Sequence, residues 1–151
     1  MISSAAMTKK VPGIATLAGD ASGLFKRHET GSRFRGFVDF DGRACALLEV
    51  ADTPGKRAQG MMKRQSLLDG CGMIFTDLEP YGAFWMKNCL IPLDVIFLDR
   101  SKKASRIYSM PADGGRARYP YTTEKTAIEL PYGFCDKYGI TEGVTCKWRT
   151  W

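Results

Sequence analysis

The sequence has a single histidine, and its five cysteines include no CxxC pair. Structural zinc sites need about four Cys or His ligands, usually in closely spaced pairs. A Cys–His hydrolase would have to use His28 as its base, and His28 lies in an N-terminal stretch without sustained periodicity. We therefore expect no metal site, no cofactor and no catalytic residues, so the protein is predicted not to be an enzyme.

The sequence also lacks a long hydrophobic run. A membrane span needs about 18–20 consecutive apolar residues, and Lys87, Asn88 and Asp94 interrupt the longest apolar stretches. The basic N-terminus is followed only by a short, mildly apolar stretch that Pro12 and Gly13 break, which matches a secretory signal poorly. We expect no membrane partner, no signal peptide and an intracellular location.

What is present fits one ordinary domain: 151 residues, of which 44% are hydrophobic. The net charge is +6, and residues 1–36 carry +4 of it in a stretch rich in Gly, Ser, Thr and Ala. We interpret 1–36 as an extended basic arm and 37–151 as a single β-rich domain. Basic pairs beyond the arm are scattered among acidic residues, so nucleic acid is not an expected partner.

From Phe37 onward, short apolar segments alternate with turn-forming residues, which is typical of β-strands. The nearly continuous apolar run at 93–99 predicts a strand covered on both faces. Residues 111–125 contain two prolines and two adjacent glycines and predict a long loop. The predicted strands are 37–40, 45–50, 71–75, 83–87, 93–99, 104–110, 126–130 and 144–148.

Two short helices complete the expected secondary structure. In the first, Asp52 or Thr53 can cap the N-terminus, Pro54 suits the first helical position, and Ala58, Met61 and Met62 should face the core. The second spans 132–139 and ends at a glycine suited to a left-handed C-cap. Many short strands with two helices predict a mostly β fold, a compact barrel-like or sandwich domain.

The candidate site lies in residues 84–99, FWMKNCLIPLDVIFLD, where polar residues interrupt apolar runs. If the strands on either side of the turn pair, Lys87 and Asp94 come close, and a buried Asp needs such a partner. Asn88 can brace the turn. One interpretation is a salt-bridged hairpin. The other is a small pocket beside Trp85 that binds a ligand or peptide group through Trp85, Lys87, Asn88 and Asp94.

The same residues resemble a known family. The segments VADTPGKRAQGMMKRQSL, GMIF, FWMKNCLIPLDVIFLD and AIELPYGFCDKYGITEG follow, in order, the pattern of the domain of unknown function 192 family. The resemblance runs from about Leu48 to Gly143. It implies a compact, mostly β, barrel-like domain and no established enzymatic activity. Members occur in bacteria, archaea and some of their viruses, and many bacterial members are exported.

The chain departs from the family pattern at several points. Cys89 stands where Thr is usual after WMKN, and Cys71 precedes GM where an acidic residue or Gly is usual. The final GD is replaced by EGVT, and the loop at 111–125 lacks the cysteines of some members. We interpret the chain as a divergent, non-exported member. Cys71 and Cys89 lie at the ends of two predicted strands and could form a disulfide under oxidising conditions.

Two functions are open on this basis. In the first, the domain is a non-enzymatic structural or protein-interaction module that its N-terminal arm docks into a larger, multi-copy assembly, with a bacteriophage virion as one such setting. A basic arm of small residues on a compact domain suits docking onto a neighbour. In the second, it is a small-ligand or peptide-binding housekeeping protein that uses the pocket near Trp85.

Overall fold

The computed structural model describes residues 33–151. Its helices are α2 (Pro54–Gln59) and α3 (Phe134–Tyr138). Its strands are β1 (Gly36–Asp39), β2 (Cys45–Ala51), β3 (Cys71–Phe75), β4 (Ala83–Phe84), β5 (Leu93–Leu98), β6 (Ala104–Met110), β7 (Tyr119–Pro120), β8 (Thr126–Pro131) and β9 (Lys147–Thr150). The expected mostly β fold with two short helices is confirmed.

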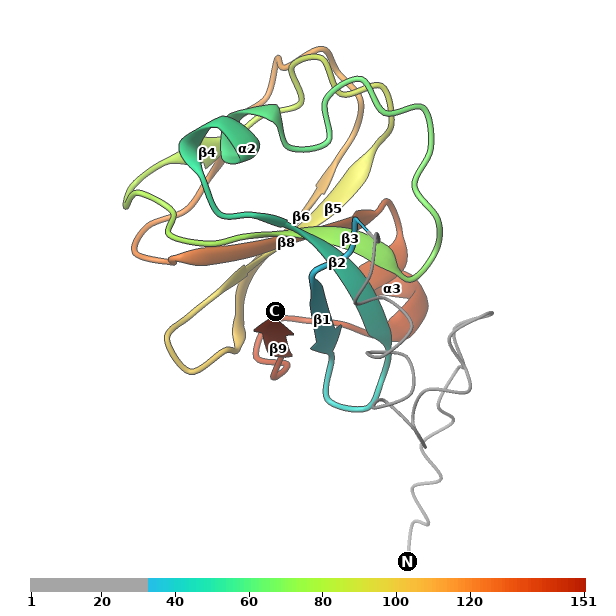
Figure 1. Cartoon of the computed structure of the whole chain (residues 1–151), viewed down its shortest axis with the longest axis vertical. Coiled ribbons are helices and arrows are strands. Elements are labelled where there is room, and N and C mark those ends of the chain that lie inside the picture. The colour runs from blue at the N-terminus through green and yellow to red at the C-terminus, as the bar shows by residue number, and fades with distance from the viewer. Residues whose placement is uncertain (1–32) are drawn as a thin grey trace, which may run out of the picture.

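Seven strands form one curled sheet in the order β6-β5-β8-β3-β2-β1-β9, and β4 with β7 forms a small second sheet (Figure 1). All neighbours in the large sheet are antiparallel except β2 and β3, which are parallel. Parallel neighbours need a crossover connection, and residues 52–70, which include α2, provide it. The curled sheet makes the domain a half-barrel, in agreement with the barrel-like expectation.

The two faces of the sheet bury two separate hydrophobic clusters. Alternate residues of the central strands point to opposite faces, so Ile74 and Ile128 join one cluster while Met73 and Phe75 join the other. In Figure 1, α3 and the β1–β9 end of the sheet lie on one side of the central strands, and α2 and β4 lie on the other. The second side carries both cavities of interest.

Local sequence signals position α2 as expected at its start and differently at its end. The Thr53 hydroxyl accepts a hydrogen bond from the Lys56 amide at 3.2 Å, and Pro54 occupies the first turn. The helix ends at Gln59 and buries none of its residues. Ala58 is exposed and Met62 half-buried, so their expected core positions are wrong. Met61 is buried, but it lies beyond the helix.

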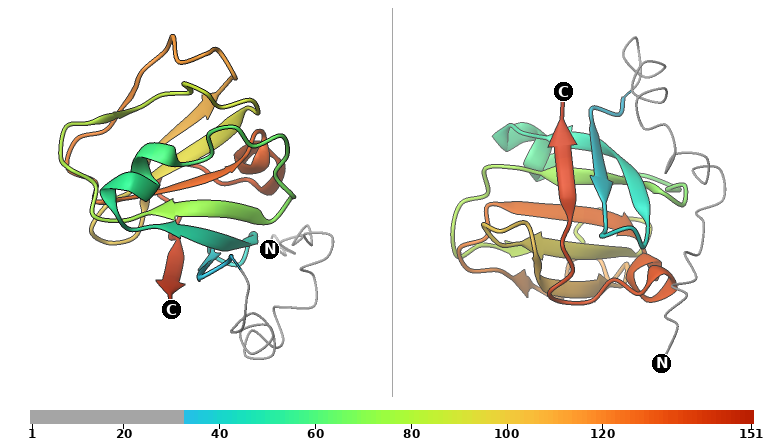
Figure 2. Two further views of the ribbon diagram at one scale, coloured as in Figure 1. Left: turned by 45° about the horizontal axis from the view of Figure 1, so that its top comes forward. Right: turned by 90° about the horizontal axis from the view of Figure 1, so that it is seen from below.

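Most strand boundaries fall close to the predicted ones, and two differ. The expected strand at 83–87 shrinks to β4, whose partner β7 lies inside the segment expected to be an irregular loop. The last strand lies at Lys147–Thr150, three residues later than expected, and pairs with β1 at the edge of the sheet (Figure 2). Among residues 33–151, no helix is long and apolar enough to span a membrane.

The first described residues belong to the packed domain. The Arg35 amide donates to the Leu48 carbonyl at 2.9 Å, and the Arg33 guanidinium pairs with Glu49 at 3.2 Å. The sequence had assigned both arginines to the arm. Most of that arm, and with it the prediction that it docks onto a partner, lies outside the described residues.

Candidate functional site

Trp85, the first of the predicted site residues, follows β4 and keeps 40% of its surface exposed. Two cations lie near its ring: the Arg118 guanidinium at 4.4 Å from the centroid and the Lys87 ammonium at 5.1 Å. Gly115, with a positive φ, lies so close that a Cβ there would be 3.0 Å from the Lys87 backbone. The loop 111–118 therefore packs over Trp85 and Lys87.

Asp94 does not join this group, and the expected Lys87–Asp94 ion pair is wrong. The two strands expected to form a hairpin do not pair: β4 pairs with β7, and β5 pairs with β6 and β8. Asp94 is buried and accepts hydrogen bonds from the Ser109 hydroxyl and the Cys135 amide, both at 3.0 Å. These two neutral donors satisfy the carboxylate without any lysine.

Asn88 lies in a turn, and its backbone, rather than the side-chain amide that was expected, braces the turn. Its φ is 59°, a conformation that Asn tolerates better than most residues. Its carbonyl accepts a hydrogen bond from the Lys63 amide at 2.7 Å, which ties the turn to the segment after α2. Of the four predicted site residues, Trp85 lines one of the two cavities described below, and the other three line neither of them.

That cavity, the Glu129 pocket, has a volume of about 300 Å³ and lies between α2 and the sheet. Its walls combine apolar and aromatic side chains with several polar ones. The lining residues are Arg57, Ala58, Gln59, Gly60, Met61, Met62, Phe75, Leu78, Glu79, Ala83, Phe84, Trp85, Cys89, Tyr121 and Glu129. The volume is at the lower end of the roughly 300–1,000 Å³ that small-molecule sites typically have.

Glu129 is the unusual member of this lining. Its side chain comes from the middle of β8 and is only 5% exposed. Its Oε2 atom has no hydrogen-bond partner among residues 33–151. Burial alone raises the pKa of this carboxyl to about 8. Glu129 was not predicted from the sequence, although the signal is there: it is a lone acid in the apolar segment AIELP, as Asp94 is in its own strand.

Cys89 lines the same pocket. Burial and the nearby Glu129 charge raise the pKa of its thiol to about 11, so the thiol stays protonated and is a poor nucleophile at neutral pH. Burial likewise raises the thiol pKa of Cys71, and both cysteines are free. A Cys71–Cys89 disulfide under oxidising conditions stays a prediction.

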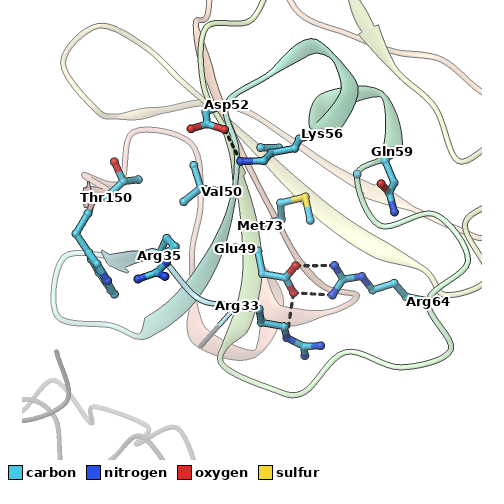
Figure 3. A pocket seen from close by; sticks show the side chains of 13 residues that line it. Arg33, Arg35, Glu49, Val50, Asp52, Lys56, Gln59, Arg64, Met73 and Thr150 are labelled. Carbon is cyan, nitrogen blue, oxygen red and sulfur yellow. Dashed lines mark hydrogen bonds and ion pairs between the residues drawn. The ribbon is translucent and has the colours of Figure 1, made fainter. Parts of the chain in front are cut away.

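A second cavity, the Glu49 cleft, has a volume of about 410 Å³ on the other side of Gln59 and Gly60, which line both cavities. Figure 3 shows Arg64 and Arg33 approaching Glu49 from two sides. Arg64 donates to both carboxylate oxygens, at 2.5 and 2.6 Å, and the Arg33 Nε lies 3.2 Å away. The most buried charge of this cleft is therefore fully paired.

The two glutamates occupy equivalent positions in one cross-strand row. Met73 of β3 pairs with Glu49 of β2 on one side and with Glu129 of β8 on the other. Residues opposite one another point to the same face, and strands lie about 4.8 Å apart, so the two glutamates lie roughly 10 Å apart on one face. Within residues 33–151 no group of three or more His, Cys, Asp or Glu side chains could hold a metal ion. The prediction of no metal is untested by this.

The geometry defines a small half-barrel β domain with a ligand-sized pocket on one face of its sheet. Residues 37–148 match the sequence profile of domain of unknown function 192, described as "Uncharacterized ACR", and the chain belongs to this family. The match confirms the resemblance found from the WMKN and IPLD motifs.

Two solved structures resemble this fold. A protein of unknown function from Novosphingobium aromaticivorans is 30% identical, with a TM-score of 0.68 over 76% of this chain and 84% of that chain. A protein from Sinorhizobium meliloti 1021, described provisionally as a transcription regulator, is 24% identical, with a TM-score of 0.66 over 78% and 97%. The second likeness supports the fold alone. No curated protein matches the chain.

Proposed function

We propose that this domain is a small-ligand-binding protein and that its site is the Glu129 pocket. The observation that carries the proposal is the Oε2 atom of Glu129, which is buried against the pocket without a hydrogen-bond partner among residues 33–151. An unsatisfied buried polar group costs about 1–3 kcal/mol, so such groups call for a specific explanation. A ligand that supplies the missing hydrogen bond is the explanation that also accounts for the cavity beside it.

The other buried acids strengthen this choice. Asp94 accepts two hydrogen bonds, and Glu124 accepts from Ser105, Arg106 and Thr122. Their partners lie within the fold, so neither needs an external one. Glu129 also lies among aromatic walls that would supply most of the buried apolar contact with a ligand.

Nuclear magnetic resonance with isotope-labelled full-length protein and a library of small aromatic fragments tests the proposal. We expect shifts in the amide signals of residues 57–62, 83–89 and 127–130. Glu129→Gln should weaken the response, whereas Glu142→Gln, the same change at an exposed site, should not. Binding that maps elsewhere, or that ignores Glu129→Gln, would contradict the proposal.

Docking of the N-terminal arm into an assembly remains the other hypothesis from the sequence, and the virion setting belongs to it. Its test is a chain that begins at Gly36. Since Arg33 and Arg35 contact the domain, a chain that begins at Arg33 is the matched control. If docking requires the arm, both shortened chains should fold and neither should join an assembly that holds the full chain. Retention of both would refute the docking hypothesis.

A further inference from the structure

The charges around the Glu129 pocket indicate what kind of ligand it takes. Besides Glu129, its titratable lining side chains are Arg57, Glu79, Cys89 and Tyr121. The Arg57 guanidinium donates to the Thr76 carbonyl at 3.0 Å and so already has a partner. With the thiol and the phenol neutral, the lining side chains that can carry a charge are Glu129, Glu79 and Arg57. Once Glu129 is ionised, two acids face one base, and the pocket is then net acidic on a chain whose net charge is +6.

The aromatic walls favour the same kind of ligand. Phe84 packs edge-on against Phe75 and Tyr121, with ring centroids 4.9 and 6.1 Å apart, so the rings form a continuous wall. Trp85 at the rim already lies within 5.1 Å of one lysine ammonium and 4.4 Å of one guanidinium. Ring faces attract organic cations, more strongly when the cation is removed from water.

We propose that the Glu129 pocket binds a protonated organic amine, whose ammonium group pairs with the Glu129 carboxylate while its apolar part lies against the aromatic wall. This inference rests on the proposed function, since it names the ligand class of that same site. A carboxylate or phosphate ligand would be repelled by an ionised Glu129 and by Glu79. A neutral ligand would hydrogen-bond to the acid but would gain nothing from its ionisation.

Binding of an amine must release a proton from Glu129. Burial raises the pKa of this carboxyl to about 8, so the free protein carries it mostly as the neutral acid at pH 7. An ammonium ion at hydrogen-bond distance favours the ionised form and lowers the pKa. The proton leaves to solvent, and affinity for the amine rises with pH until Glu129 is ionised in the free protein as well.

Benzylamine is the probe, and benzyl alcohol is its neutral match in size and shape. We expect the full-length protein at pH 7 to bind benzylamine at least roughly tenfold more tightly than benzyl alcohol, a difference of about 1.4 kcal/mol. A pH-stat titration should record close to one proton released per benzylamine bound. The preference and the proton release should vanish in Glu129→Gln. Glu79→Gln at the rim should keep the proton release.

The outcomes separate this inference from the proposed function. Equal binding of the two probes in the pocket, without proton release, would refute the amine and leave a ligand pocket. No binding of either probe, together with no response to the fragment library, would refute both. If Glu129→Gln fails to fold, the pH dependence of the unmodified protein decides: benzylamine affinity must rise between pH 6 and 8, and benzyl alcohol affinity must not.

Discussion

Glu49 and Glu129 lie in the same cross-strand row with Met73 between them, yet their surroundings differ. Arg64 and Arg33 hold Glu49, while Glu129 has no charged or hydrogen-bonding partner for its Oε2 among residues 33–151. The sheet supplies equivalent positions, so the difference comes from the segments that cover it. The turn after α2 places an arginine over Glu49, and apolar and aromatic side chains cover Glu129.

The two glutamates therefore differ: among the described residues, Glu49 is held in ion pairs, and Glu129 is not. The Glu49 carboxylate binds Arg64 and Arg33 to the sheet, and both of its oxygens have hydrogen-bond partners. Glu129 holds no arginine in this way, and the contacts within the described residues give no structural reason for an acid at this position. Substitutions at Glu129 and at the arginine that pairs with Glu49 test the two cases separately.

The largest effect is expected from Glu129→Gln across a pH range. The pKa of Glu129 is about 8 in the folded protein against an ordinary 4.5. Below pH 4.5 the carboxyl is protonated in both the folded and the unfolded protein and burying it costs little. As pH rises from 4.5 to about 8, the unfolded protein loses this proton first, so the free energy of unfolding falls. The loss is on the order of 1 kcal/mol per pH unit, or about 3 kcal/mol between pH 5 and 8.

Urea unfolding at several pH values would measure it. Unmodified protein should lose this stability relative to Glu129→Gln, and the variant should be the more stable one at pH 8. Glu142→Gln should follow the unmodified protein throughout. Parallel curves for Glu129→Gln and the unmodified protein would show that Glu129 is paired after all, and the contrast with Glu49 would disappear.

On the Glu49 side, Arg64→Met should cost about 2 kcal/mol in the free energy of unfolding. Breaking a buried pair costs roughly 3–5 kcal/mol, and the value here is lower because Arg64 is partly exposed and Arg33 remains. Chemical denaturation at pH 7 measures it. Lys56→Met removes an exposed partner of Asp52 and serves as control, with no comparable loss. Equal stability of the two variants would contradict the structural role.

Asp94 is a third case, a buried acid held by neutral donors, and a smaller loss of stability is expected there. Ser109→Ala removes one of the two hydrogen bonds to Asp94 and should cost about 1 kcal/mol. Thermal unfolding would record this as a lower Tm. Ser66→Ala, at an exposed position, should leave the Tm unchanged. No shift for Ser109→Ala would mean that water replaces the hydroxyl and that Asp94 is less enclosed than it is here.

The smallest effect is the coupling between Lys87 and Asp94. Because Asp94 uses Ser109 and Cys135, Lys87→Met and Asp94→Asn should act independently. Their double-mutant cycle should give an interaction energy below about 0.5 kcal/mol. A coupling of several kcal/mol would restore the ion pair predicted from the sequence.

The sequence predicted where the strands lie better than it predicted which strands pair. The strands at Cys71–Phe75 and Ala104–Met110 were predicted to the residue, because strand bounds depend on the apolar pattern and turn residues of the segment itself. The hairpin around Asn88 was wrong because strand pairing depends on the whole sheet. Residues 93–98 find two better partners in β6 and β8, which the local pattern does not encode.

The candidate site was predicted only at its rim. Trp85 was identified because it stands beside a conspicuous polar cluster, whereas Glu129 looks like one acid among many until its neighbours are known. The rule that led to Asp94, that a lone acid in an apolar strand needs a partner, applies equally to Glu129. Which of the two acids finds a partner is decided by tertiary contacts, and no spacing in the sequence distinguishes them.

The pairing of β9 with β1 also fixes when the fold can be completed. Residues 147–150 lie beside residues 36–39, so more than a hundred residues of chain must be synthesised before this ladder can form. Closing so long a loop makes the step slow relative to local hairpins. On the ribosome, the outer edge of β1 therefore remains open until the last strand emerges, and an open strand edge invites pairing with other chains. Translation that stops before Lys147 should yield an aggregation-prone product, even though the Glu129 pocket lies wholly within the residues already made.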